Sequence, residues 1–168
     1  MARLGLKMTS VDASEANIKT AMTHAAAGGL DIDFRAGTAE ALLETGEAPF
    51  DVIFNLEVVE HVANPDAFLA NCATLLAPGG IMFLATLNRT PKAFALAIVG
   101  AEYVLGWLPR GTHEFDKFLK PRELEAPLTA AGLICDPAQG VSFNPLTDSW
   151  RLSKDTGVNY MMVAKRPA

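Results

Sequence analysis

A short apolar run that turns abruptly polar constrains the fold of this chain most. Residues 52–54 are β-branched and aromatic, and the turn-forming pair Ala48-Pro49 precedes them, which predicts a central strand covered on both faces. Asn55 follows directly, and the segment 57–61 is rich in acidic residues. In open α/β sheets, ligands bind beyond the carboxyl ends of the parallel strands. We therefore expect the functional site at this point of the chain.

Three ionisable residues stand close together beyond that strand. Glu57, Glu60 and His61 are spaced i, i+3 and i+4, so on a helical turn they would share one face. The spacing predicts a cluster of catalytic side chains. The first turn of a solvent-exposed helix also favours glutamate, because of the helix dipole. For Glu57 or Glu60 taken alone, a catalytic role and this structural role have similar weight.

Strand and helix signals alternate along the chain. This alternation predicts an α/β fold: a doubly wound (Rossmann-like), mostly parallel sheet in three α/β/α layers. The last two strands have no helix between them, so we expect an antiparallel hairpin at one sheet edge. The expected strands are 6–11, 30–34, 52–54, 81–85, 133–143, 147–152 and 158–163, and the expected helices are 15–27, 66–76 and one that begins near residue 120 and ends near residue 131.

Two further positions suit a ligand. Asp12 ends the first expected strand, where an acidic side chain commonly accepts hydrogen bonds from the hydroxyls of a nucleoside ribose. The alternative, an aspartate that only caps the turn, has similar weight. After the next strand, Gly37 permits a tight turn and Thr38 or Glu40 could face a ligand. Turn formation alone explains these residue types equally well.

The segment 91–108 is almost wholly apolar, with only Lys92 and Glu102 as charges. A membrane-spanning helix is not expected, because about 20 apolar residues are needed to cross a bilayer. A helix at the membrane interface or a lid over an apolar substrate fits better, since Tyr103 and Trp107 suit an interface. A helix packed on the sheet is the alternative. His113 follows in a polar loop as a second candidate acid or base, and a loop histidine is more often solvated.

Composition excludes some classes of function. The net charge of −5 and the isoelectric point near 5.1 argue against a nucleic-acid partner, which needs a clustered basic face. Cys72 and Cys135 form no CxxC motif, and the first residues lack the apolar core of a signal peptide. We therefore expect two reduced thiols in a cytoplasmic protein. A chain of 168 residues suits one domain.

Four segments together resemble the class I S-adenosylmethionine-dependent methyltransferases. Within that class, the chain is most similar to the O-methyltransferase family of ubiquinone biosynthesis, which methylates polyprenyl catechols. The class resemblance rests on 9–14, 57–62, 76–80 and 86–89, and the narrower one on 99–103, on 111–113 before Lys120-Pro121, and on 144–146 before 158–161.

The resemblance implies a function and a set of site residues. It implies S-adenosylmethionine as cofactor and methyl transfer to a phenolic hydroxyl of a polyprenylated catechol. His61 would be the base, with Glu57 and Glu60 beside it, or the three residues would hold Mg²⁺. It also implies a segment 91–108 that docks on the periphery of the inner membrane, and it allows membership of a ubiquinone-biosynthesis complex. The implied cofactor residues are Asp12, Thr38, Ala39, Glu40, Asn55 and Leu56, and the implied substrate or lid residues are Tyr103, Trp107 and His113.

The amino terminus departs from the family pattern. The family has a first strand and a glycine-rich loop at the methionine part of the cofactor, whereas Met1 to Gly5 resembles the end of the helix after that loop. We therefore expect a single methyltransferase domain over 1–168 that is incomplete at its amino terminus, with 91–113 as an apolar helical insertion or lid. We also expect this chain to bind S-adenosylmethionine poorly or not at all. A non-catalytic partner in a biosynthetic complex, or a methyltransferase for another hydroxylated aromatic, is the alternative.

Overall fold

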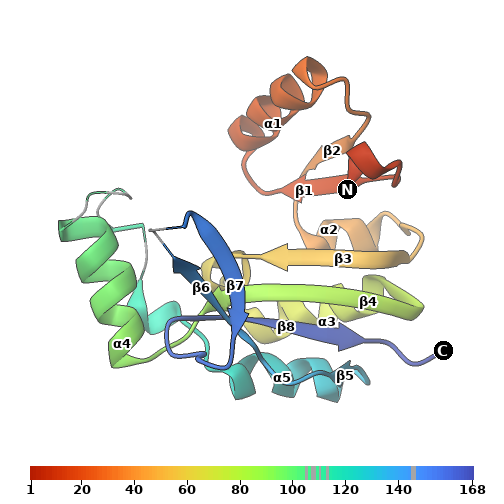
Figure 1. The fold of residues 1–168 in the computed structure, drawn as a ribbon. Coiled ribbons are helices and arrows are strands. Elements are labelled where there is room, and N and C mark those ends of the chain that lie inside the picture. The colour runs from red at the N-terminus through yellow and green to blue at the C-terminus, as the bar shows by residue number, and fades with distance from the viewer. Residues whose placement is uncertain (105, 107–108, 110, 113, 145–146) are drawn as a thin grey trace. The chain divides into compact units, whose positions relative to one another are not determined.

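A computed structural model describes residues 1–104, 106, 109, 111–112, 114–144 and 147–168. The chain divides into two units, Met1–Glu47 and Ala48–Ala168, and each contains its own sheet and helices (Figure 1). Strands and helices alternate through the first part of the chain, which confirms the predicted α/β class.

The first unit is built on two parallel strands. β1 (Thr9–Asp12) pairs with β2 (Asp33–Ala36), and α1 (Glu15–Ala27) connects them. Ser14 caps α1 as predicted, because its Oγ accepts a hydrogen bond from the Asn17 amide at 3.4 Å. The short helices η1 (Ala2–Leu4) and α2 (Ala39–Glu44) stand before β1 and after β2. The bounds of α1 were predicted correctly, whereas the strands lie up to three residues later than expected and α2 was not expected.

The second unit contains a four-stranded sheet in the order β3-β4-β8-β5. β3 (Phe50–Leu56) runs parallel to β4 (Leu76–Leu87), while β8 (Asn159–Lys165) is antiparallel to β4 and to β5 (Ile134–Cys135). Two further strands, β6 (Gly140–Asn144) and β7 (Ser149–Ser153), form a separate antiparallel hairpin. The other elements of this unit are η2 (Val59–His61), α3 (Pro65–Leu75), α4 (Pro91–Ala93), η3 (Phe94–Val104), η4 (Phe115–Lys117) and α5 (Pro121–Ala130).

Two helices and one strand supply the core of the second unit. α3 packs against α5, and their leucines Leu69, Leu124 and Leu128 are fully buried. Tyr160 on β8 is also fully buried, and its hydroxyl donates a hydrogen bond to the Leu119 carbonyl at 3.0 Å. The hydrophobic effect and this hydrogen bond hold β8 and the helices together.

Two expectations about the strands were wrong. β3 was expected to be central and covered on both faces, but it lies at the edge of the four-stranded sheet, and Val52 and Phe54 are exposed. The last two strands were expected to pair with each other. Instead β7 pairs with β6, and β8 enters the sheet between β4 and β5, because its alternating buried side chains suit an interior position.

The apolar segment that follows β4 is helical, as predicted, as far as it is described. α4 continues into η3, a wider π-type helix. Ala93 and Ile98 pack with Phe118 and Leu87, so one side of this helix is covered. The other side exposes large apolar side chains, namely Phe94, Leu96, Val99 and Tyr103. Trp107 and His113 lie outside the described residues.

None of the described helices combines the length and the apolar character that crossing a membrane requires.

Candidate functional site

The backbone takes an unusual conformation where β3 ends. Glu57 has φ of 54°, in the left-handed region that residues other than Gly, Asn and Asp rarely adopt. Its amide donates a hydrogen bond of 2.9 Å to the Ala85 carbonyl, which holds it beside β4. The one-turn helix η2 begins only at Val59. The prediction that Glu57, Glu60 and His61 share one helical face was therefore wrong, because Glu57 precedes the helical turn.

Glu60 turns into the protein. It is only 3% exposed, and its Oε2 accepts a hydrogen bond of 2.9 Å from the Thr86 hydroxyl. Oε1 is buried as well and has no hydrogen-bond partner among the described residues. A buried carboxyl oxygen without a partner is costly, so such groups commonly mark a place for a ligand, a water molecule or a proton.

Glu57 and Glu60 act on each other. Loss of hydration around the Glu57 carboxyl group, followed by the charge of Glu60, raises the pKa of Glu57 to about 7. Both effects disfavour the ionised form of Glu57, because a carboxylate loses its hydration and because two neighbouring carboxylates resist being ionised together. A carboxyl group with this pKa exchanges its proton near neutral pH, which suits a general base.

His61 lies beside this pair in a different environment. The residue is exposed, whereas Glu60 is buried. Both line a cavity of about 10 Å³, which is about the space of one water molecule. The other lining residues are Thr112, Glu114, Lys117 and Phe118.

The structure does not support a metal site at these residues. In the part of the chain that the structure describes, no three His, Cys, Asp or Glu side chains are arranged to hold a metal ion. Glu60 faces Thr86 and the interior while His61 is exposed, so the predicted Mg²⁺ ligands Glu57, Glu60 and His61 do not converge.

Asn55 is a buried amide at the end of β3. It is 3% exposed, and neither its Oδ1 nor its Nδ2 has a partner among the described residues. Asn55 pairs in register with Leu84, two residues before Thr86, so both polar side chains lie on the same face of the sheet. An amide with both polar atoms unpaired fits a position that a ligand completes. Leu56, the next expected cofactor residue, is 46% exposed.

The remaining expected cofactor residues lie in the first unit. Asp12 Oδ1 accepts hydrogen bonds from the Ser14 amide at 2.7 Å and from Asn17 Nδ2 at 3.3 Å, and Oδ2 accepts from the same Nδ2 at 3.2 Å. Asp12 thus fixes its own turn and leaves lone pairs on Oδ2. Thr38 caps α2, because its Oγ1 accepts from the Ala41 amide at 3.3 Å. Ala39 and Glu40 form the first turn of that helix.

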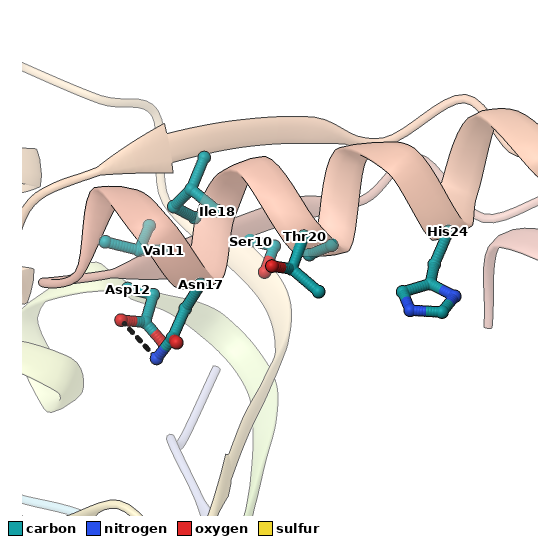
Figure 2. A pocket seen from close by; sticks show the side chains of 8 residues that line it. Ser10, Val11, Asp12, Asn17, Ile18, Thr20 and His24 are labelled. Carbon is teal, nitrogen blue, oxygen red and sulfur yellow. Dashed lines mark hydrogen bonds between the residues drawn. The ribbon is translucent and has the colours of Figure 1, made fainter.

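A hollow of about 380 Å³ lies beside Asp12 and was not predicted from the sequence (Figure 2). Figure 2 shows Asp12 and Asn17 at one end and His24 at the other, along α1. Asn17, Thr20 and His24 recur at helical spacing, and that pattern could have indicated a shared face. Only the Asp12 end lies at the carboxyl ends of the strands, where ligands bind in such sheets. The lining residues are Ser10, Val11, Asp12, Asn17, Ile18, Thr20, Ala21 and His24.

Residues 1–84 match a family described as a methyltransferase domain. The chain is 62% identical over 168 residues to a ubiquinone biosynthesis O-methyltransferase of Maricaulis maris, covering all of this chain and 66% of that protein. It is 64% identical over 166 residues to the protein of the same name from Parvibaculum lavamentivorans, covering 99% and 65%. The chain thus spans about two thirds of the length of these curated relatives.

Solved structures with low identity share the fold. The plantazolicin methyltransferase BamL, solved with a triazolic desmethylPZN analogue and SAH, has a TM-score of 0.66 at 15% identity and covers 95% of this chain and 68% of that one. A methyltransferase of Thermotoga maritima, described as SAM-dependent and as a possible histamine N-methyltransferase, has a TM-score of 0.64 at 18% identity, covering 98% and 75%. At these identities the likeness concerns the fold alone.

Proposed function

The chain belongs to the methyltransferase family, in the group of ubiquinone-biosynthesis O-methyltransferases, and from this premise we propose that the whole protein is an O-methyltransferase. It transfers a methyl group from S-adenosylmethionine to a phenolic hydroxyl of a polyprenylated catechol. The observation that carries the proposal is the placement of Glu57 and the buried Glu60 directly after β3, with Glu60 Oε1 unpaired among the described residues.

The carboxyl pair suits the chemistry of the acceptor. Methyl transfer from a sulfonium to a phenol is an in-line displacement, so alignment of the reacting atoms supplies much of the rate. The acceptor hydroxyl has a pKa of about 10, like tyrosine, and must lose its proton. We propose Glu57 as the group that accepts this proton, with Glu60 beside it, and His61 as a second candidate. The S–CH₃ bond breaks, the O–CH₃ bond forms and the phenolic proton goes to the carboxylate.

Two sets of residues support cofactor binding. S-adenosylmethionine would meet Asp12 through its ribose hydroxyls, with Thr38, Ala39 and Glu40 near its adenine. In the second unit, the unpaired amide of Asn55 supports a ligand-binding role for Asn55 and Leu56 at the end of β3. The cofactor supplies an electrophilic methyl group when it is bound. These residues only bind and orient it.

The apolar helix supports a substrate with a lipid tail. Phe94, Leu96, Val99 and Tyr103 are exposed on α4 and η3, where a soluble helix would normally be polar. We propose that this helix, as part of the segment 91–113, lies on the periphery of the membrane from which the polyprenyl substrate comes. Tyr103, together with Trp107 and His113 later in the sequence, is the candidate residue for contacting the substrate or for forming a lid over it. Flotation with anionic liposomes tests this, and a protein that stays entirely in solution would contradict it.

Activity is tested on the longest natural chain that contains these residues. Transfer of a labelled methyl group to a polyprenylated catechol is expected, together with cofactor binding by calorimetry. Glu57→Gln should lower turnover by about a hundredfold or more, as loss of a general base does, and leave cofactor affinity nearly unchanged. His61→Ala in parallel shows whether the histidine carries the proton instead.

A non-catalytic role is the competing function. A chain that binds neither cofactor nor catechol but is recovered with other enzymes of the pathway would favour a partner in a biosynthetic complex. Transfer to soluble hydroxylated aromatics with no preference for a lipid tail would favour a methyltransferase of another substrate.

A further inference from the structure

The two carboxyl residues that follow β3 are both held by the neighbouring strand. The Glu57 amide donates a hydrogen bond of 2.9 Å to the Ala85 carbonyl. The Thr86 hydroxyl donates another, also of 2.9 Å, to Oε2 of Glu60. Ala85 and Thr86 are consecutive residues of β4, which lies beside β3 in the sheet (Figure 1). One short stretch of β4 therefore fixes the backbone of the first carboxyl residue and the side chain of the second.

Thr86 is a rigid anchor for the Glu60 side chain. It is fully buried on an interior strand, between β3 and β8, and it pairs in register with Tyr160, which is also fully buried. The Tyr160 hydroxyl donates to the Leu119 carbonyl, so this neighbour is fixed as well. A threonine side chain is stiff at χ1, whereas a glutamate side chain has much more rotational freedom to lose. The threonine hydroxyl thus determines where the carboxyl group lies.

Packing alone does not require a carboxyl group at position 60. The one-turn helix η2 already has an apolar anchor in Val59, which is fully buried. Burying a carboxyl group costs free energy unless its oxygens are paired, and Oε1 of Glu60 has no partner among the described residues. An apolar pair of the same shape as Thr86 and Glu60 would fill both positions at little or no cost. The bond from Thr86 therefore holds a group that stability does not call for, which indicates a chemical use.

The charge of Glu60 acts on Glu57. After the loss of hydration, it is the next cause that raises the pKa of Glu57. The other charged groups near Glu60 are His61, Glu114 and Lys117, which line the small cavity with it. The Lys117 ammonium is paired with the Glu114 carboxylate at 2.7 Å. A carboxylate held beside Glu57 makes Glu57 a stronger proton acceptor, because it favours the protonated form of its neighbour.

We propose that Thr86 is a positioning residue for the methyl transfer, because its hydroxyl holds the Glu60 carboxylate beside Glu57 while Glu57 accepts the phenolic proton. This inference rests on the proposed function, in which Glu57 is the base. Thr86 itself takes no part in making or breaking a bond. Without its hydroxyl, the Glu60 carboxyl group has no hydrogen bond among the described residues that keeps it in place. Glu57 then loses the neighbouring charge for part of the time.

Thr86→Val tests the proposal in the longest natural form of the protein. Valine keeps the shape of threonine and lacks the hydroxyl. With labelled methyl transfer to a polyprenylated catechol, kcat per cofactor-binding site should fall about tenfold or more, since displacing a catalytic group by about 1 Å can cost about a hundredfold. KM for both substrates should change by less than about twofold, as when an interaction of the transition state alone is lost. Thr74→Val is the matched control, because the Thr74 hydroxyl bonds to the Ala70 carbonyl of its own helix in an exposed place.

Further variants separate positioning from stability. Thr86→Ser keeps the hydroxyl and Thr86→Ala does not, while both lack the methyl group, so the serine variant should retain most of the rate and the alanine variant should lose it. This pair carries the test if the valine variant does not fold. Glu60→Gln should itself lower kcat. Adding Thr86→Val to it should lower kcat by less than about a further twofold, because residues that act through one another are not additive.

The remaining outcomes overturn the inference. An unchanged kcat per site in Thr86→Val would leave the bond with a structural role alone. An equal fall of kcat with and without the Glu60→Gln change would show that Thr86 does not act through Glu60. A higher KM at constant kcat would place Thr86 in substrate binding. Wild-type transfer is measured first: its absence ends the proposed function and this inference with it, whereas equal transfer by wild type and Thr86→Val ends this inference only.

Discussion

Thr86 and Glu60 are joined by a buried hydrogen bond of 2.9 Å, from the threonine hydroxyl to Oε2 of the carboxyl group. Thr86 stands near the end of β4 and Glu60 belongs to η2, which follows the neighbouring strand β3. The bond therefore ties the polar segment after β3 to the next strand of the sheet. It also directs the second carboxyl oxygen to a buried place where no described residue bonds to it.

Replacing Thr86 by valine should destabilise the protein. Valine has nearly the same shape but no hydroxyl, so the Glu60 carboxyl group would lose the one hydrogen bond it makes in the described structure. A buried polar group left without a partner costs about 1–3 kcal/mol, and urea unfolding would measure this loss. Thr20→Val is the matched control, because the Thr20 hydroxyl bonds to its own helix in an exposed place. Equal losses in the two variants would contradict the role of the bond.

The Glu57 carboxyl group should make stability depend on pH. Its folded pKa of about 7 lies above the ordinary value of 4.5, so between these values the folded state binds more protons than the unfolded state. The stabilisation from this group is thus complete below about pH 4.5 and is lost as the pH rises towards 7. Glu57→Gln removes the titration. Wild type should lose stability relative to this variant from pH 5 to 7, and a constant difference would refute the raised pKa.

The sequence predicted some elements of this fold closely, for physical reasons. Ser14 before Glu15 and Gly28-Gly29 after Ala27 are strong local signals, and α1 has these bounds. In α2 the signals are weak, because the helix has six residues and buries only Leu42. The partners of β8 depend on contacts distant in sequence, so the pattern of 158–163 predicted a strand and not its neighbours.

The sequence predicted the end of β3 and not the geometry of the residues that follow it. Polar residues after an apolar run marked the end of β3 correctly. The i, i+3, i+4 spacing assumed a helix from Glu57 onward, and a left-handed glutamate is not visible in a sequence. Nothing local in the sequence indicates that Thr86 bonds to a residue 26 positions away.

Cofactor binding should depend on Asp12. In the longest natural form of the protein, Asp12→Asn should weaken the binding of S-adenosylmethionine about tenfold or more, because hydrogen bonds to a charged group contribute roughly 1.5–3 kcal/mol. Calorimetry on the two forms measures the difference, and an unchanged affinity of the variant would refute a role for Asp12 at the ribose.

Glycine at position 140 should be indispensable for the position of the hairpin. Any Cβ there would overlap the Asp155 carbonyl at 1.8 Å, and the clash is with backbone, which no side-chain rotation relieves. Gly140→Ala should therefore cost at least about 1–3 kcal/mol on urea unfolding, the usual range for overpacking. Gly28→Ala is the control, since a Cβ at that position meets its neighbours at 3.5 Å or more, in ordinary contact. Because Asp155 also pairs with Lys92, displacing the hairpin should loosen the start of α4, which hydrogen exchange at Ala93 would detect. If Gly140→Ala and Gly28→Ala unfold at the same urea concentration, the close approach of β6 to residue 155 does not hold the hairpin.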